Sequence, residues 1–188
     1  MYYVEWQKRG LPHIHILLWL KDKLKLNQID NIISAEIPDP SSDKKLHDIF
    51  VKNMMHRPCG PHNAHASCMK NGKCSNKFPR KLQKETIHNE NGYPQYRSIS
   101  PADRGQTATI KLRNGDYATV GNSWVVPYSS VLTKLFNVHI NVEACSSVRA
   151  IKYICKYINK GSDQAIFNFK NAELENTIDE VYIYQFGR

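Results

Sequence analysis

The feature that most constrains the fold of this chain is a pair of histidines, His13 and His15, inside an apolar run at residues 13–20. Isoleucine and leucine alternate with the two histidines, which is the period of a β-strand, and the apolar content predicts that this strand is buried. Residues 2–7 are also strand-like, and residues 9–12 (Arg-Gly-Leu-Pro) are typical of a turn. We therefore predict an antiparallel hairpin from which two imidazoles leave on one face.

The register of this hairpin decides which side chain lies beside the histidines. If the loop has an odd number of residues, odd positions oppose odd positions, and Glu5 and Gln7 share the face of His13 and His15. Two neutral imidazoles and a carboxylate or amide oxygen can surround one divalent ion. We predict a metal site of His13, His15 and Glu5, with Gln7 as the alternative to Glu5. Two half-buried, hydrogen-bonded histidines without metal are the competing interpretation.

The net charge indicates the class of partner. The 188 residues carry 26 basic and 17 acidic side chains, a net charge of +9. This excess predicts a polyanionic partner, and nucleic acid is favoured over a membrane because no apolar run approaches transmembrane length. A merely basic soluble protein is the alternative. The 5 cysteines are odd in number and no signal peptide is present, so we expect reduced thiols and an intracellular protein, nuclear in a eukaryote.

A second group of metal-ligating side chains lies at residues 56–74, where three cysteines and three histidines are separated by Gly, Pro and Asn. Such a loop cannot bury enough apolar surface to order itself, and it suits a tetrahedral zinc ion. The expected ligands are Cys59, Cys68 and Cys74, with a fourth from His56, His62 or His65. We expect this zinc to be structural, because a closed Cys-rich site leaves no open position. Free thiols in a polar loop are the alternative.

The rest of the chain predicts short elements. We expect helices at residues 27–35, 43–56 and 129–136, and strands at residues 93–100, 106–112, 117–126 and 137–143. The strands before residue 123 belong to a β-rich insertion at about residues 57–123. Residues 76–84 are a basic run that suits a phosphate backbone or a solvated loop.

A last helix is predicted at residues 148–160, begun by a serine cap and ended by Gly161. Tyr153 and Tyr157 are four residues apart and therefore share one face. Three lysines repeat at the same interval on an adjacent face: Lys152, Lys156 and Lys160. Two tyrosines at the edge of a packed helix are the ordinary interpretation, but a His-x-His pair upstream favours a chemical role.

Together these patterns resemble the two-tyrosine branch of the HUH nucleases, the group of rolling-circle replication initiators and relaxases. More narrowly, the chain resembles the replication-initiator domain of Helitron transposases, often called the Helitron helicase-like region. The segments that carry the resemblance are residues 7–19 (QKRGLPHIHILLW), 59–61 (CGP), 68–74 (CMKNGKC), 78–79 (FP) and 150–161 (AIKYICKYINKG). The resemblance runs from residue 5 to about residue 163.

The resemblance implies an α+β fold, an antiparallel sheet with helices of the HUH, ferredoxin-like type, over residues 1–163. Residues 164–188 would begin a following segment, and we expect the N-terminal part of the domain to be missing. A helicase domain normally belongs to the same polypeptide in this family. The 188 residues contain no phosphate-loop motif, so they do not include that helicase.

The implied reaction is nicking and strand transfer on single-stranded DNA, with Mg²⁺ or Mn²⁺ held by Glu5, His13 and His15. Tyr153 or Tyr157 would attack the phosphate and leave a 5′-phosphotyrosine and a free 3′-hydroxyl, while the lysines of that helix hold the strand. Two alternatives remain. One is an inactive transposon-derived fragment that at most binds DNA, and the other is a zinc-stabilised DNA-binding protein with a structural His-x-His.

Overall fold

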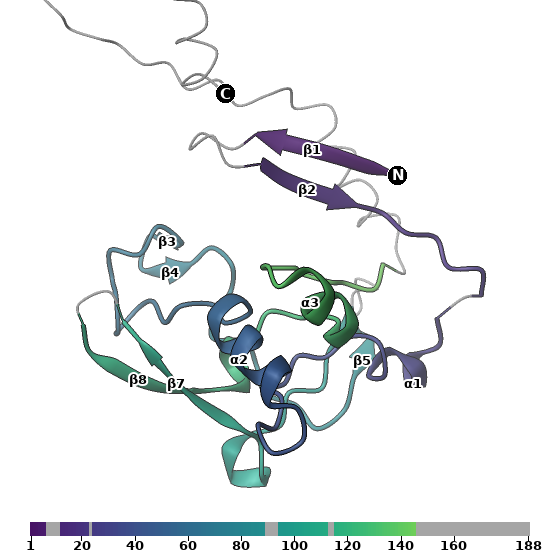
Figure 1. Cartoon of the computed structure of the whole chain (residues 1–188). Coiled ribbons are helices and arrows are strands. Elements are labelled where there is room, and N and C mark those ends of the chain that lie inside the picture. Colours follow the sequence, from purple (N-terminus) through teal and green to yellow (C-terminus); the bar gives the residue numbers. More distant parts are fainter. Residues whose placement is uncertain (7–11, 23, 89–93, 113–114, 146–188) are drawn as a thin grey trace, which may run out of the picture. The chain divides into compact units, whose positions relative to one another are not determined.

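The computed structural model describes residues 1–6, 12–22, 24–88, 94–112 and 115–145 (Figure 1). The chain divides into two compact units, and the larger is Leu24–Ser146. The described part of the smaller unit lies within Met1–Lys23. The predicted helix at residues 148–160, with its two tyrosines and three lysines, lies outside the described residues, and so does Gln7.

The smaller unit contains the predicted antiparallel hairpin. Strand β1 (Tyr2–Trp6) pairs with β2 (Pro12–Ile16), and Glu5 lies opposite His13. Pairing continues at the open end, where the backbone N–H of Leu17 donates to the Met1 carbonyl at 2.9 Å. The five-residue connection is odd in length, so the register follows the periodicity of the sequence.

The burial and length predicted for the second strand are wrong. The strand ends at Ile16, and the Ile14 and Ile16 side chains are 56% and 60% exposed. The physical reason is that a two-stranded sheet does not cover its own faces, and no layer of described residues in this unit packs on the face that carries Ile14 and Ile16.

The larger unit is built around α2 (Lys44–Asn53), whose buried Leu46 and Phe50 lie one turn apart. Asp43 caps this helix, because its carboxylate accepts a 2.9 Å hydrogen bond from the Leu46 N–H. Helix α3 (Ser130–Phe136) corresponds to the helix predicted at residues 129–136. It lies beside α2 (Figure 1). The Phe50 and Met54 side chains are fully buried in the core.

The first predicted helix is shorter than expected. Helix α1 covers only Leu26–Ile29, although residues 27–35 were predicted. Beyond it, Ser34 exchanges two backbone hydrogen bonds with Tyr128, at 2.8 and 2.9 Å. This distant pairing replaces the helical hydrogen bonds, while Ile29 and Ile33 still reach the core.

Three further two-stranded antiparallel sheets belong to the larger unit. They are β3 (Met69–Lys70) with β4 (Lys73–Cys74), β5 (Ile87–His88) with β6 (Pro94–Gln95), and β7 (Thr107–Lys111) with β8 (Tyr117–Gly121). Short 3₁₀ helices η1 (Pro101–Asp103) and η2 (Asn122–Trp124) complete the elements. The β7–β8 hairpin buries alternate residues, as the predicted strands require. The fold is therefore mixed α and β, with small antiparallel sheets and a few helices.

The strand predicted at residues 137–143 is wrong. The segment is irregular, and its polar groups bond to scattered partners: the His139 ring nitrogen lies 2.7 Å from the Asn53 carbonyl, and the Val142 N–H donates to Pro127 at 2.9 Å. Alternating polarity had indicated a strand, but no neighbouring strand is available to pair with it among the described residues.

Within the described ranges, no helix is both long and apolar enough to cross a membrane.

Candidate metal centre

Four predicted zinc ligands converge in the larger unit: His56, Cys59, Cys68 and Cys74. Their ligand atoms all lie within 4.8 Å of one another. The His56 Nε2 lies 3.7 Å from the Cys59 Sγ and 3.6 Å from the other two sulfurs. A tetrahedral zinc with Zn–S of about 2.3 Å and Zn–N of about 2.0–2.1 Å separates these atoms by about 3.6 Å. The cluster could therefore bind a metal ion such as zinc.

The structure also selects among the three candidates for the fourth ligand. His56 joins the three sulfurs, whereas His62 and His65 do not belong to the cluster. The His62 ring instead meets the edge of the Trp124 ring, with centroids 6.5 Å apart. His56 is placed by the end of α2, where its N–H donates to the Trp124 carbonyl at 2.8 Å.

Aromatic stacking holds the His56 ring. The His56 and Phe78 rings are stacked with centroids 4.2 Å apart. The Trp124 ring is also parallel to His56, with centroids 6.1 Å apart. The Arg80 guanidinium lies 5.0 Å above the Phe78 ring, a cation–π distance. Burial, and then the charge of Arg80, lower the pKa of His56, which favours the neutral imidazole that coordinates metals.

A tight turn brings Cys68 and Cys74 together. Strands β3 and β4 are joined by Asn71 and Gly72, which have φ of 51° and 74° and so form the two-residue turn with both central residues left-handed. The Asn-Gly pair is the sequence signal for this turn. The Ser75 N–H then donates to the Cys68 carbonyl at 2.7 Å, which closes the loop. We call residues 56–77 the Cys/His knuckle.

The cysteines have different electrostatic environments. Burial, followed by hydrogen bonds with Cys74 and Cys68, raises the pKa of Cys59 to about 12. Burial also acts to raise the pKa of Cys74, but the backbone N–H groups of Phe78 and Asn76 outweigh it and lower that pKa. These N–H groups favour the thiolate, the form that binds metal. A bound cation would supply the same stabilisation to Cys59.

The hairpin of the smaller unit brings together the other predicted ligands. The His15 Nε2 lies 3.0 Å from the Glu5 Oε2, and these side chains are only 15% and 13% exposed. The His13 and His15 ring centroids are 4.7 Å apart. The face therefore carries two imidazoles and a carboxylate. Among the described residues, however, only His56, Cys59, Cys68 and Cys74 form a group whose ligand atoms lie close enough together to hold one ion.

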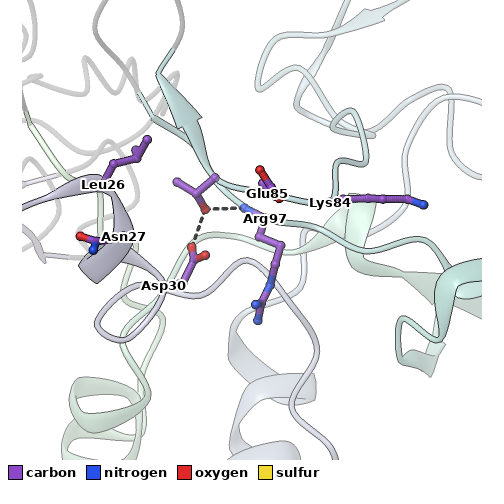
Figure 2. Close-up of a pocket in the computed structure, with 7 residues that line it drawn as sticks. Leu26, Asn27, Asp30, Lys84, Glu85 and Arg97 are labelled. Atoms are coloured by element: carbon purple, nitrogen blue, oxygen red, sulfur yellow. Dashed lines mark hydrogen bonds between the residues drawn. The ribbon is translucent and has the colours of Figure 1, made fainter.

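A pocket of about 660 Å³ lies in the larger unit, between α1 and the segment around Thr86 (Figure 2). The Thr86 hydroxyl bonds the Asp30 carboxylate and accepts the Arg97 N–H at 2.8 Å. None of the residues predicted for a site lines this pocket. Its polar side chains hold loops together, so we assign it no chemistry.

Sequence reasoning missed the residues that support the cluster, namely Phe78, Arg80 and Trp124. Phe78 stands in the basic run at residues 76–84, where it had no assigned role, and Trp124 is 68 residues from His56. No local pattern indicates that these rings stack, because the contact is tertiary.

Comparison with protein-family models gives no match, and comparison with curated proteins gives none either.

Proposed function

We propose that this chain nicks and transfers single-stranded DNA by a metal-dependent tyrosine mechanism. The observation that carries the proposal is the pairing of Glu5 with His13, which brings a carboxylate and the imidazoles of His13 and His15 to one face of a hairpin. The sequence resemblance to the Helitron replication initiators supports it, together with the net charge of +9.

The donor set determines what this face can do. Mg²⁺ or Mn²⁺ held there would polarise the scissile phosphate and stabilise the charge that develops on it. Glu5 contributes a negative charge that offsets the ion, and His15 is fixed by its contact with Glu5 at 3.0 Å.

Tyr153 and Tyr157 are the proposed nucleophiles, and both lie outside the described residues. The phenolic oxygen of one tyrosine forms a bond to the scissile phosphorus, the bond from phosphorus to the 3′ oxygen breaks, and that oxygen takes a proton to become the 3′-hydroxyl. The 5′-phosphotyrosine keeps the energy of the phosphodiester, so rejoining needs no ATP. Lys152, Lys156 and Lys160 would hold the strand.

A covalent adduct tests the proposal. The full chain is incubated with Mn²⁺ and a single strand labelled at its 3′ end, the end that stays attached to the protein, and denaturing electrophoresis detects a labelled protein band. We expect the band with the parent chain and its loss in the Tyr153→Phe, Tyr157→Phe double variant. Tyr117→Phe, which changes an exposed tyrosine on β8, is the matched control and should keep it. Absence of the band with the parent chain, or its persistence in the double variant, would overturn the proposal.

A second candidate is a zinc-stabilised DNA-binding module without chemistry. The cluster of one imidazole and three sulfurs favours it, because a closed site of this kind orders a loop and leaves no position for a substrate. Binding to DNA without adduct formation at any Mn²⁺ concentration would select this candidate.

A further inference from the structure

The Cys/His knuckle and the segment after it hold most of the net positive charge of the chain. Residues 56–84 contain no Asp or Glu and seven basic residues, whereas the other 159 residues carry 19 basic and 17 acidic side chains. The seven are Arg57, Lys70, Lys73, Lys77, Arg80, Lys81 and Lys84. A run of this length without an acidic residue concentrates a positive potential on one part of the fold.

The β3–β4 hairpin presents part of this charge to solvent. Lys70 and Lys73 are direct partners across the two strands, and both are exposed. Like charges in this position oppose pairing, so the hairpin forms despite them. Lys77 is exposed three residues after Cys74. Three cations are therefore spaced around one metal ligand.

The basic residues differ in whether an acidic group already neutralises them. Lys84 pairs with Asp103 at 3.2 Å, and Arg80 lies 3.9 Å from Glu143. In the part of the chain that the structure describes, Lys70, Lys73 and Lys77 make no ion pair. Arg57 and Lys81 make no ion pair with a described residue either, so four of the five unneutralised cations of residues 56–84 lie on the knuckle.

We infer that Lys70, Lys73 and Lys77 form a surface that binds the phosphate backbone of DNA, and that the metal-held knuckle sets their spacing. This surface belongs to the larger unit, so the inference goes beyond the nicking proposal and does not depend on it. Removing the metal leaves the formal charge of the lysines unchanged but releases the turn that positions them.

The surroundings of the lysines argue against insertion into a lipid surface and against stacking of bases. Among the described residues, no large apolar side chain between residues 56 and 84 is exposed, so the knuckle has nothing to insert into a lipid interface. Phe78 is only 8% exposed and is covered by His56 and Arg80, so it offers no face on which a base could stack. Backbone contacts without base contacts position a strand without reading its sequence.

The test compares two sets of charge removals in the zinc-loaded full chain. Fluorescence anisotropy measures binding to a labelled mixed-sequence single strand at several salt concentrations, without Mn²⁺ or Mg²⁺. The knuckle variant is Lys70→Gln, Lys73→Gln, Lys77→Gln. The matched control is Lys45→Gln, Lys52→Gln, Lys111→Gln, which removes the same charge from exposed positions elsewhere in the larger unit.

We expect the knuckle variant to bind at least about tenfold more weakly and the control to change by less than about twofold. The slope of log K against log salt is negative, and each lost phosphate contact on a single strand makes it shallower by about 0.7. The slope should therefore become shallower by about 2 in the knuckle variant alone. Equal weakening in the two variants would overturn the inference, because it would show a general effect of charge. Strong dependence on base sequence would overturn the backbone assignment.

Removing the metal provides the second measurement. Chelation should weaken binding by the parent chain about as much as the lysine substitutions do, and should have little further effect on the knuckle variant. Unchanged binding by the chelated parent chain would overturn the role of the metal. All these binding results are independent of adduct formation. A chain that forms no adduct can still bind DNA through the knuckle, and a chain that forms the adduct can fail to bind through it.

Discussion

The β1–β2 hairpin and the Cys/His knuckle place metal-ligating side chains in opposite ways. In the hairpin, regular strand register puts Glu5 beside the two histidines. In the knuckle, the ligands stand on turns, and rings from distant parts of the chain fix His56. Strand geometry places three side chains on one face, whereas the four ligand atoms of the knuckle converge with support from the core.

The knuckle and the hairpin also differ in the donor atoms that they carry. Three sulfurs and one imidazole close a tetrahedron and suit a structural ion. Two imidazoles and one carboxylate leave positions open for a substrate oxygen. The comparison therefore predicts that loss of a knuckle metal lowers stability, whereas a substitution in the hairpin slows the proposed strand transfer and leaves stability unchanged.

The largest effect is expected from Cys68→Ser, which removes one of the four knuckle ligands. Structural zinc supplies binding free energy on the order of 10 kcal/mol in small zinc domains, so the knuckle should lose both its metal and its fold. Elemental analysis should show loss of bound zinc, and the melting temperature should fall. Cys145→Ser, which changes an exposed cysteine outside the cluster, is the control. Zinc retention by Cys68→Ser at full stoichiometry would contradict the assignment.

Phe78→Ala tests the aromatic support of the knuckle. The change removes the ring that stacks on His56, and burial of this size is worth about 3 kcal/mol. Chemical denaturation should show that loss, and zinc affinity should fall with it. Phe136→Ala changes a phenylalanine that is 57% exposed and should cost much less. Equal losses in the two variants would show that the stacked position has no special role.

His15→Ala addresses the hairpin. Removing a group that helps to stabilise the charged phosphate should slow adduct formation by about 10²–10³-fold, while zinc content and melting temperature stay unchanged. His65→Ala removes an exposed histidine outside the metal cluster. It should leave the rate of adduct formation, the zinc content and the melting temperature unchanged. A fall in zinc content with His15→Ala would break the distinction between the two regions.

Gly72→Ala tests the turn between β3 and β4. The φ of Gly72 is +74° and nothing lies within 4 Å of an added Cβ, so the expected cost of about 1 kcal/mol is backbone strain alone. Gly115→Ala carries the same kind of strain, with a φ of +94° and open space around the Cβ. Both variants should lose similar stability by denaturation, but only Gly72→Ala should weaken zinc binding. A zinc affinity that falls equally in both would remove the link between the turn and the metal.

The smallest effect concerns Asp43, which belongs to neither metal region. A hydrogen bond from Lys134, then one from the Leu46 N–H, lower the pKa of Asp43 below its usual value. The cap therefore stabilises the fold above the usual carboxyl pKa, and this contribution disappears as the pH falls through the lowered folded value. The melting temperature of Asp43→Ala should be below that of the parent chain at neutral pH, and the difference should close in acid. Asp22→Ala is the control. A difference in melting temperature between the parent chain and Asp43→Ala that persists in acid, after Asp43 protonates, would contradict this account.

Local patterns predicted the parts of the fold that local physics decides. The alternation around His13 predicted the hairpin, and its register followed from an odd loop length. The helix predicted at residues 43–56 corresponds to α2. The cysteines of the knuckle were recognisable because Gly, Pro and Asn separate them and leave no apolar stripe. In each case the residues concerned lie within about twenty positions of one another.

The predictions of helices and strands failed where hydrogen bonds to residues far away in the chain determine the secondary structure. The helix predicted at residues 27–35 ends early because Ser34 bonds Tyr128, and residues 137–143 bond Asn53 and Pro127 in place of a neighbouring strand. Periodicity indicates which face of an element is apolar, but it does not identify the partner that takes up the backbone hydrogen bonds.

The sequence by itself determined the residue types and the spacing from which each metal site can be built, because register and turn geometry depend only on neighbouring residues. Only the tertiary structure decided that His56, and not His62 or His65, completes the knuckle, because that choice depends on the rings of Phe78 and Trp124. Stacking and core packing join residues that are far apart in the chain, and no local pattern encodes which of them meet.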